Sequence, residues 1–104
     1  MNTEQMTART RGAQDEIEGQ ISVAVRVTED LDAAIRRIRA YANETAYAGS
    51  HEDARAYSRT LATHVQDAQE ALQQISARMF SITALTQEVS TLGVARFIQP
   101  SPSE

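Results

Sequence analysis

Apolar side chains recur at steps of three and four residues on both sides of the chain's midpoint. Before Gly49 the stripe holds Ile17, Ile21, Ala24, Thr28, Leu31, Ile35, Ile38 and Ala42. After Gly49 it holds Tyr57, Leu61, Val65, Ala68, Leu72, Ile75, Met79, Ile82, Thr86 and Val89. Such spacing places side chains on one face of an α-helix and is typical of helices that pair along a seam. The pattern predicts two amphipathic helices and no β-strand.

Gly49 interrupts this pattern close to the midpoint of the 104-residue chain. Gly costs about 1 kcal/mol relative to Ala inside a helix, so we expect the helix to break there, with Gly49 in a positive φ or otherwise outside the helix. Ser50 can then cap a new helix, because its hydroxyl can accept a hydrogen bond from the amide of the third helical residue. Glu52 and Asp53 follow near the positive end of the helix dipole. One uninterrupted helix through Gly49 is the alternative.

The element boundaries follow from these breaks. We expect a first helix at about 13–46, a turn at 47–50 and a second helix at about 51–92. Gly12 and Gly19 weaken the start of the first helix, which leaves a start near Thr3 open. Gly93 and the prolines beyond it predict the end of the second helix, a helical hairpin domain of residues 1–98 and a disordered tail of residues 99–104.

The fold class is therefore all-α. A connection of about four residues is too short for the second helix to go elsewhere, so the helices should form an antiparallel helix-turn-helix hairpin. The chain has five aromatic residues and no Trp, which leaves little bulk for a core. We expect two hairpins to dimerise into a four-helix bundle. The predicted core and interaction residues are Ile17, Ile21, Leu31, Ile35, Ile38, Leu61, Leu72, Ile75, Met79 and Ile82.

Charge and composition exclude several classes of function. All ten basic residues are Arg, and 14 acidic residues bring the net charge to −4. This balance disfavours binding to nucleic acid or to an anionic membrane. No apolar run approaches the ~20 residues of a membrane span, and the first thirty residues lack the apolar segment of a signal peptide. The absence of Cys excludes disulfides and thiolate sites.

Two polar clusters are candidates for chemistry. His64, Asp67 and Glu70 could share a cation, but the first helix offers no second His, and a solvated polar edge is the better interpretation. Arg36, Arg37 and Arg39 form the densest basic cluster, which we interpret as a solvated face with an Asp32–Arg36 ion pair. We predict no enzyme activity, cofactor or metal, since no base is arranged with the Ser and Thr residues.

The tripeptide Tyr47-Ala48-Gly49 is an aromatic-x-Gly in the turn of a predicted hairpin of about one hundred residues. In this it resembles the W-x-G superfamily of small early-secreted-antigen-like proteins handled by type VII secretion systems. The resemblance covers the whole outline and one tripeptide, with Tyr47 in the place of Trp and Gly49 in the place of Gly. No Tyr-x-x-x-Asp/Glu, the pattern associated with export in that family, follows the second helix.

The resemblance implies a dimer that is secreted without a cleavable signal peptide, with a secretion ATPase as a further partner. It also implies a turn motif of Tyr47, Gly49 and Ser50, in which the Tyr47 ring packs on the hairpin end or into a partner. From the residues themselves we predict a non-catalytic protein–protein interaction module that pairs with itself or with a similar hairpin. The alternative is a cytoplasmic helical accessory factor that binds nucleic acid or a larger assembly.

Overall fold

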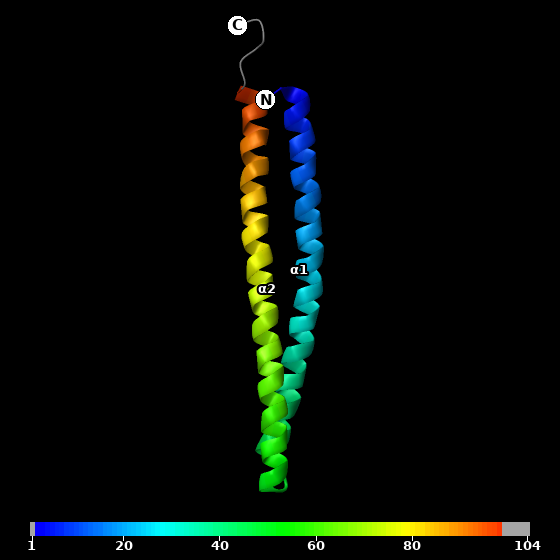
Figure 1. Cartoon of the computed structure of the whole chain (residues 1–104), viewed down its shortest axis with the longest axis vertical. Coiled ribbons are helices and arrows are strands. Elements are labelled where there is room, and N and C mark those ends of the chain that lie inside the picture. Colours follow the sequence, from blue (N-terminus) through cyan, green and yellow to red (C-terminus); the bar gives the residue numbers. More distant parts are fainter. Residues whose placement is uncertain (1, 99–104) are drawn as a thin grey trace, which may run out of the picture. The chain divides into compact units, whose positions relative to one another are not determined.

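The computed structural model describes residues 2–98 and consists of two helices joined by a short turn (Figure 1). Helix α1 spans Thr3–Ala46 and helix α2 spans His51–Ile98. Residues 2–98 contain no strand. The prediction of an all-α hairpin is confirmed, and the alternative of one uninterrupted helix is wrong. The predicted tail of residues 99–104 lies outside the described residues.

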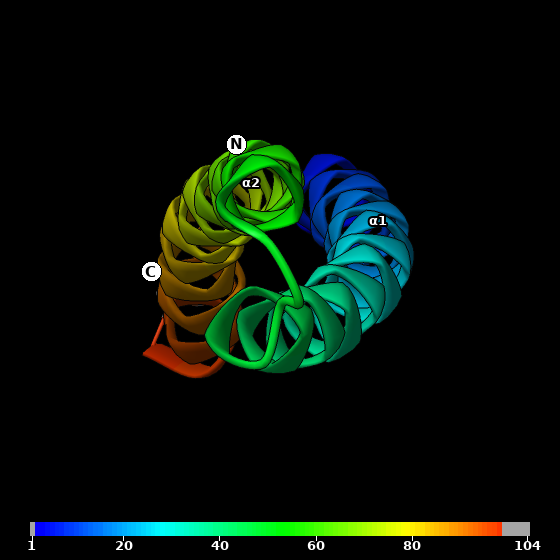
Figure 2. The ribbon, with the colours of Figure 1, turned by 90° about the horizontal axis from the view of Figure 1, so that it is seen from below.

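The helices pack as two units. Unit 1 combines the part of α1 up to Val23 with the part of α2 from Ala77 onward, and unit 2 is the hairpin Ala24–Ser76. In each unit a stretch of α1 lies against a stretch of α2 that runs in the opposite direction, and unit 2 contains the turn. Figure 2, seen from the turn end, shows the short connection that leads from α1 to α2.

Two capping hydrogen bonds between Asn2 and Gln5 fix the start of α1. The Asn2 Oδ1 accepts a hydrogen bond from the Gln5 amide at 2.8 Å, and the Asn2 amide donates to the Gln5 Oε1 at 3.0 Å. This reciprocal arrangement satisfies two backbone amides at the helix start. Helix α1 therefore begins at Thr3, the earlier of the two starts that the sequence left open, and it continues through Gly12 and Gly19.

The start of α2 follows the predicted cap. The Ser50 Oγ accepts a hydrogen bond from the amide of Asp53, the third helical residue, at 3.1 Å. Glu52 and Asp53 occupy the first turn of α2, where the helix dipole favours negative charge. The predicted end near residue 92 is wrong, because α2 continues through Gly93 to Ile98. A single Gly costs only about 1 kcal/mol, which a long helix with packed neighbours tolerates.

The turn tests two expectations about the aromatic-x-Gly tripeptide, each of which named two outcomes. Gly49 lies outside both helices, as expected, and its φ is not positive, so the reversal uses backbone conformations that other residues can adopt. The Tyr47 ring does not pack on the hairpin end, since Tyr47 is 83% exposed. Gly49 therefore acts by weakening the helix at this point and not by supplying a left-handed residue.

Replacing Gly49 by Ala should raise the free energy of unfolding by about 0.4 to 1 kcal/mol, because Ala has fewer conformations to lose on folding. A Cβ at Gly49 would meet no atom within 4 Å. Thermal or urea unfolding checks this. Ser50→Ala is the neighbouring control and should lower stability by about 1 kcal/mol through loss of the cap. A loss of stability in Gly49→Ala would mean that the turn requires glycine.

Candidate interaction surface

Buried and half-buried side chains in both units follow the heptad spacing of a paired-helix seam. We label heptad positions so that Ile17, Ala24, Leu31 and Ile38 of α1, and Leu61, Ala68, Ile75 and Ile82 of α2, occupy position a. The seam then consists of positions a and d. In unit 1 it contains Met6, Thr10, Ala13, Ile17 and Gln20 with Arg78, Ile82, Leu85, Val89 and Leu92. In unit 2 it contains Ala24, Val27, Leu31, Ala34, Ile38, Tyr41 and Thr45 with Ala54, Tyr57, Leu61, His64, Ala68, Ala71 and Ile75.

The ten predicted core and interaction residues occupy two heptad positions, a and e. Six of them lie half-buried in the seam: Ile17, Leu31, Ile38, Leu61, Ile75 and Ile82. The other four are exposed at position e: Ile21 by 41%, Ile35 by 47%, Leu72 by 54% and Met79 by 51%. The expected stripe thus combined positions a and e, whereas the seam combines a and d.

The two patterns cannot be separated by spacing, because both give alternating steps of three and four. At position d the seam uses small or polar residues, such as Gln20 and Ala34 in α1 or His64, Ala71 and Arg78 in α2. Sequence hydrophobicity favoured their larger neighbours at position e. In the structure the small side chains let the two helices meet, and the larger ones remain on the side of the seam.

Position e lies on the same side of the hairpin in both helices. Because α1 and α2 run in opposite directions, a two-fold axis perpendicular to the seam relates them, and equivalent heptad positions fall on one side. Position b is the next position outward. We call the e and b residues of unit 2 the open flank: Val25, Thr28, Asp32, Ile35, Arg39, Ala42 and Ala46 of α1, with Arg55, Ser58, Ala62, Val65, Gln69, Leu72 and Ser76 of α2. Every one of these residues is exposed.

The open flank is the apolar exposed side of unit 2. It carries Ile35, Val65 and Leu72 at position e and Val25 at position b, all classed among the exposed large apolar residues. Its only charged residues are Asp32, Arg39 and Arg55, whereas most Asp, Glu and Arg residues of this unit lie at other exposed positions. Large apolar side chains that are exposed on one side of a helix pair, with few charges among them, are typical of a binding surface.

Unit 1 exposes apolar side chains of its own. Ile21 and Met79 occupy position e of the two helices, as Ile35 and Leu72 do in unit 2. Phe80 and Val94 lie further out on α2 and are 80% and 59% exposed. Met79 and Phe80 belong to the most apolar run of the sequence.

The seam also contains polar side chains. The Arg78 Nη1 donates a hydrogen bond to the Gln20 Oε1 at 3.2 Å, and within residues 2–98 the buried Arg78 Nε has no hydrogen-bond partner. The His64 ring lies 5.3 Å from the Tyr41 ring, and Tyr41 also lies 6.4 Å from Tyr57. His64 is therefore a seam residue, and its interpretation as part of a solvated edge is wrong.

The two polar clusters singled out by the sequence do not converge on a ligand. The His64 Nδ1 lies 3.7 Å from the Asp67 Oδ2, too far for a hydrogen bond, and no group of three His, Asp or Glu residues within 2–98 is placed to hold a metal ion. Arg36 pairs with Asp32 at 2.8 Å, as expected. Arg36 and Arg39, three residues apart, are exposed neighbours at positions f and b, whereas Arg37 lies at position g, so the three spread over a broad exposed arc of α1.

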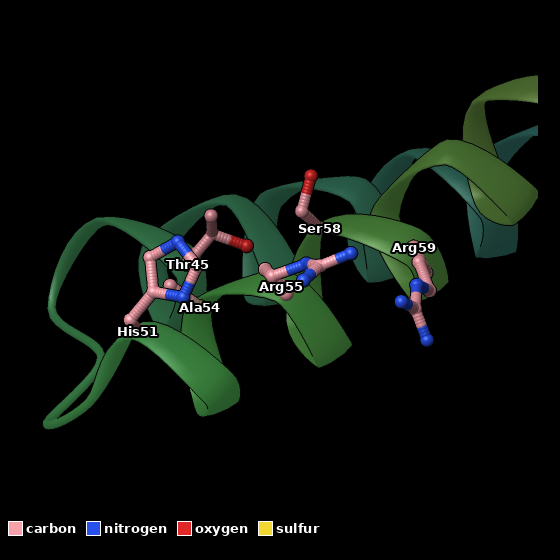
Figure 3. A pocket seen from close by; sticks show the side chains of 6 residues that line it. All are labelled: Thr45, His51, Ala54, Arg55, Ser58 and Arg59. Carbon is pink, nitrogen blue, oxygen red and sulfur yellow. The ribbon is translucent and has the colours of Figure 1, made fainter.

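A shallow, open hollow of about 420 Å³ lies beside the turn (Figure 3). Thr45 of α1 and His51, Ala54, Arg55, Ser58 and Arg59 of α2 line it. In Figure 3 the Arg59 side chain points away from the side on which the Ser58 hydroxyl lies. Within residues 2–98 no hydrogen bond joins Ser58 to His51, so the hollow lacks the nucleophile–base pair of a hydrolytic site.

Comparison of the chain with protein-family models, with curated proteins and with solved structures finds no match. Neither α1 nor α2, over the residues described, combines the length and apolar character needed to cross a membrane. The exposed apolar side chains of the hairpin are the structural feature that best indicates a function.

Two valines of α1 test the position of the seam. Val27 is 5% exposed at position d, whereas Val25 is 54% exposed at position b. Val27→Ala should lower the free energy of unfolding by about 2 kcal/mol, from two lost methyl groups and the space they leave. Val25→Ala is the matched control and, at a protein concentration at which the chain is monomeric, should change it by less than about 0.5 kcal/mol, because Val25 is exposed in the single hairpin. Urea unfolding measures both, and equal effects would contradict the seam described here.

Proposed function

We propose that this chain is a non-catalytic protein–protein interaction module, whose hairpin pairs with a second helical hairpin in a four-helix bundle. One observation carries the proposal: the seam of the hairpin buries very little. Within the described residues the buried apolar side chains are Met6, Ala13, Val27, Ala34, Ala68 and Ala71, and no side chain is less than 2% exposed.

The energetics of so small a core favour association. Ordering one residue costs roughly 1 to 2 kcal/mol of conformational entropy, whereas burial of a methyl group returns only about 0.8 kcal/mol. Four of the six buried residues are Ala, so burial in the seam contributes little free energy to folding. A second hairpin that covers positions e and b would bury Ile35, Val65 and Leu72 as well. Helices of a bundle core use three apolar positions per heptad in this way.

The resemblance to the W-x-G family supports a narrower proposal about biology. The Tyr47-Ala48-Gly49 tripeptide lies at the turn of a helical hairpin, and the exposed Tyr47 ring is accessible to a partner. We propose export with a type VII secretion system, with a secretion ATPase as a further partner; a cytoplasmic interaction module is the alternative location. A gene for a type VII motor ATPase, or a paired small helical gene, beside this gene would support export.

Stability of the purified protein should depend on its concentration. If association stabilises the fold, each tenfold increase in concentration adds about 1.4 kcal/mol per dimer, which raises the melting temperature by about 4 °C for two chains of this size. Circular dichroism melts between about 1 and 100 μM measure this. Sedimentation at the same concentrations gives the oligomeric state.

A strictly monomeric species that keeps full helicity and a constant melting temperature over this range would overturn pairing with a second copy. The same behaviour in the presence of every similarly shaped helical partner encoded beside the gene would overturn the interaction proposal. No activity measurement enters either test, because the proposal assigns no catalytic residue.

A further inference from the structure

We propose that the open flank of unit 2 pairs with the same flank of a second copy of this chain, about a two-fold axis at Ile35, so that Asp32 of each copy meets Arg39 of the other. The inference rests on the proposed function, because it names the partner and the surface of the same association. It identifies the partner as a second copy of this chain and not as a different hairpin.

The order of charges on α1 carries this inference. Asp32 lies three residues before Ile35 and Arg39 lies four residues after it, all on the open flank. When two copies of a helix run antiparallel about Ile35, each residue before the axis faces a residue after it. Asp32 then lies within one residue, about 1.5 Å along the helix, of the level of the other copy's Arg39, twice in the dimer. Opposite charges on the two sides of the axis make the surface complementary to itself.

The neighbouring residues fit the same axis. Thr28 would face Ala42 of the other copy, and Val25 would face Ala46, so no charge of α1 on this flank lies against an apolar side chain. Moving the axis one heptad back, to Thr28, would set Asp32 against Val25 instead. Burial of an unpaired carboxylate against an apolar side chain is costly. Of these registers, the one at Ile35 pairs both charges of α1 on this flank.

Both charged groups can make the new contact. None of the ion pairs within residues 2–98 involves Arg39. The Asp32 carboxylate uses its Oδ2 for Arg36 at 2.8 Å, and its side chain remains 59% exposed. The Oδ1 of Asp32 can therefore accept from a second guanidinium while the first pair persists. A carboxylate between two Arg residues forms a network, which contributes more reliably than an isolated exposed pair.

The α2 side of the flank supplies apolar contacts at the same level. Tyr41 of α1 packs against Tyr57 and His64, and this register places Val65 level with Ile35. Val65 and Ile35 are 37% and 47% exposed. A two-fold axis at Ile35 would set the two isoleucines against each other and bring the two valines close to the same axis. Together they would form an apolar centre between the charge pairs.

A single introduced cysteine tests the axis, because the natural chain has none. A residue on a two-fold axis meets its own copy, so Ile35→Cys should form a disulfide-linked dimer on mild oxidation. Ile21→Cys is the matched control: the same residue type, also at position e, with a similar exposure of 41%. We expect Ile35→Cys to cross-link at least about tenfold faster, because only this Cys lies near its own copy.

Charge reversal tests the complementary pair in the full-length protein. Arg39→Asp should weaken the dimer roughly 3- to 30-fold in sedimentation, since two attractive contacts become repulsive. Adding Asp32→Arg should restore the dissociation constant to within about threefold, because the pairs are then reversed. Arg37→Asp is the control, since Arg37 lies at position g, away from the open flank; it should change the constant less than about twofold.

The outcomes separate the two proposals. Faster cross-linking at Ile35 together with rescue by the double reversal would support self-pairing about this axis. If the protein dimerises but Ile21→Cys links as fast as Ile35→Cys, or the double reversal gives no rescue, the axis is wrong while the interaction module stands. A strictly monomeric, fully helical protein would overturn the self-pairing whatever other partner it binds.

Discussion

Two helices that meet along one seam can bury only the side chains at positions a and d, and in this chain small or polar residues hold much of position d. Ala34 and Ala71 fill little volume there and Gln20 is polar, so the seam of neither unit becomes a large apolar core. Beside the seam, further large apolar side chains lie exposed at position e, such as Ile21 and Met79 in unit 1 and Ile35 and Leu72 in unit 2. Whatever stabilises the fold beyond the hairpin must therefore act on the sides of the helices.

Most of the architecture could be predicted from local chemistry. The turn follows from Gly49 and the Ser50 cap, since the hydroxyl accepts the Asp53 amide as the sequence suggests. The helical period follows from the spacing of apolar residues, which no strand could satisfy. The early start of α1 was also readable, because Asn2 and Gln5 have the spacing of a capping box. Gly12 and Gly19 lie nearby, and their low helix propensity favoured a later start.

The face of each helix could not be predicted in the same way. Positions a with d and positions a with e give the same alternation of threes and fours, so hydrophobicity was the only guide, and it favoured Ile35 over Ala34. Packing obeys a second rule, since small side chains allow close approach of two helices. The same limit applies to Gly49: a glycine at a turn suggests a positive φ, but this reversal does not use one. Only the backbone geometry decides such a case.

The polar members of the seam show why two hairpins suit this sequence better than one. A rotation of each helix by about 50°, half the angle between successive residues, would bury position e and release position d to solvent. Gln20 and Arg78 would then lose their 3.2 Å hydrogen bond, and the His64 ring would lose its contact with the Tyr41 ring. A lone hairpin must choose between these contacts and the burial of Ile35 or Leu72. In the four-helix bundle that we propose, the seam would keep its polar contacts and the second hairpin would cover position e, so both sets of side chains would be satisfied together.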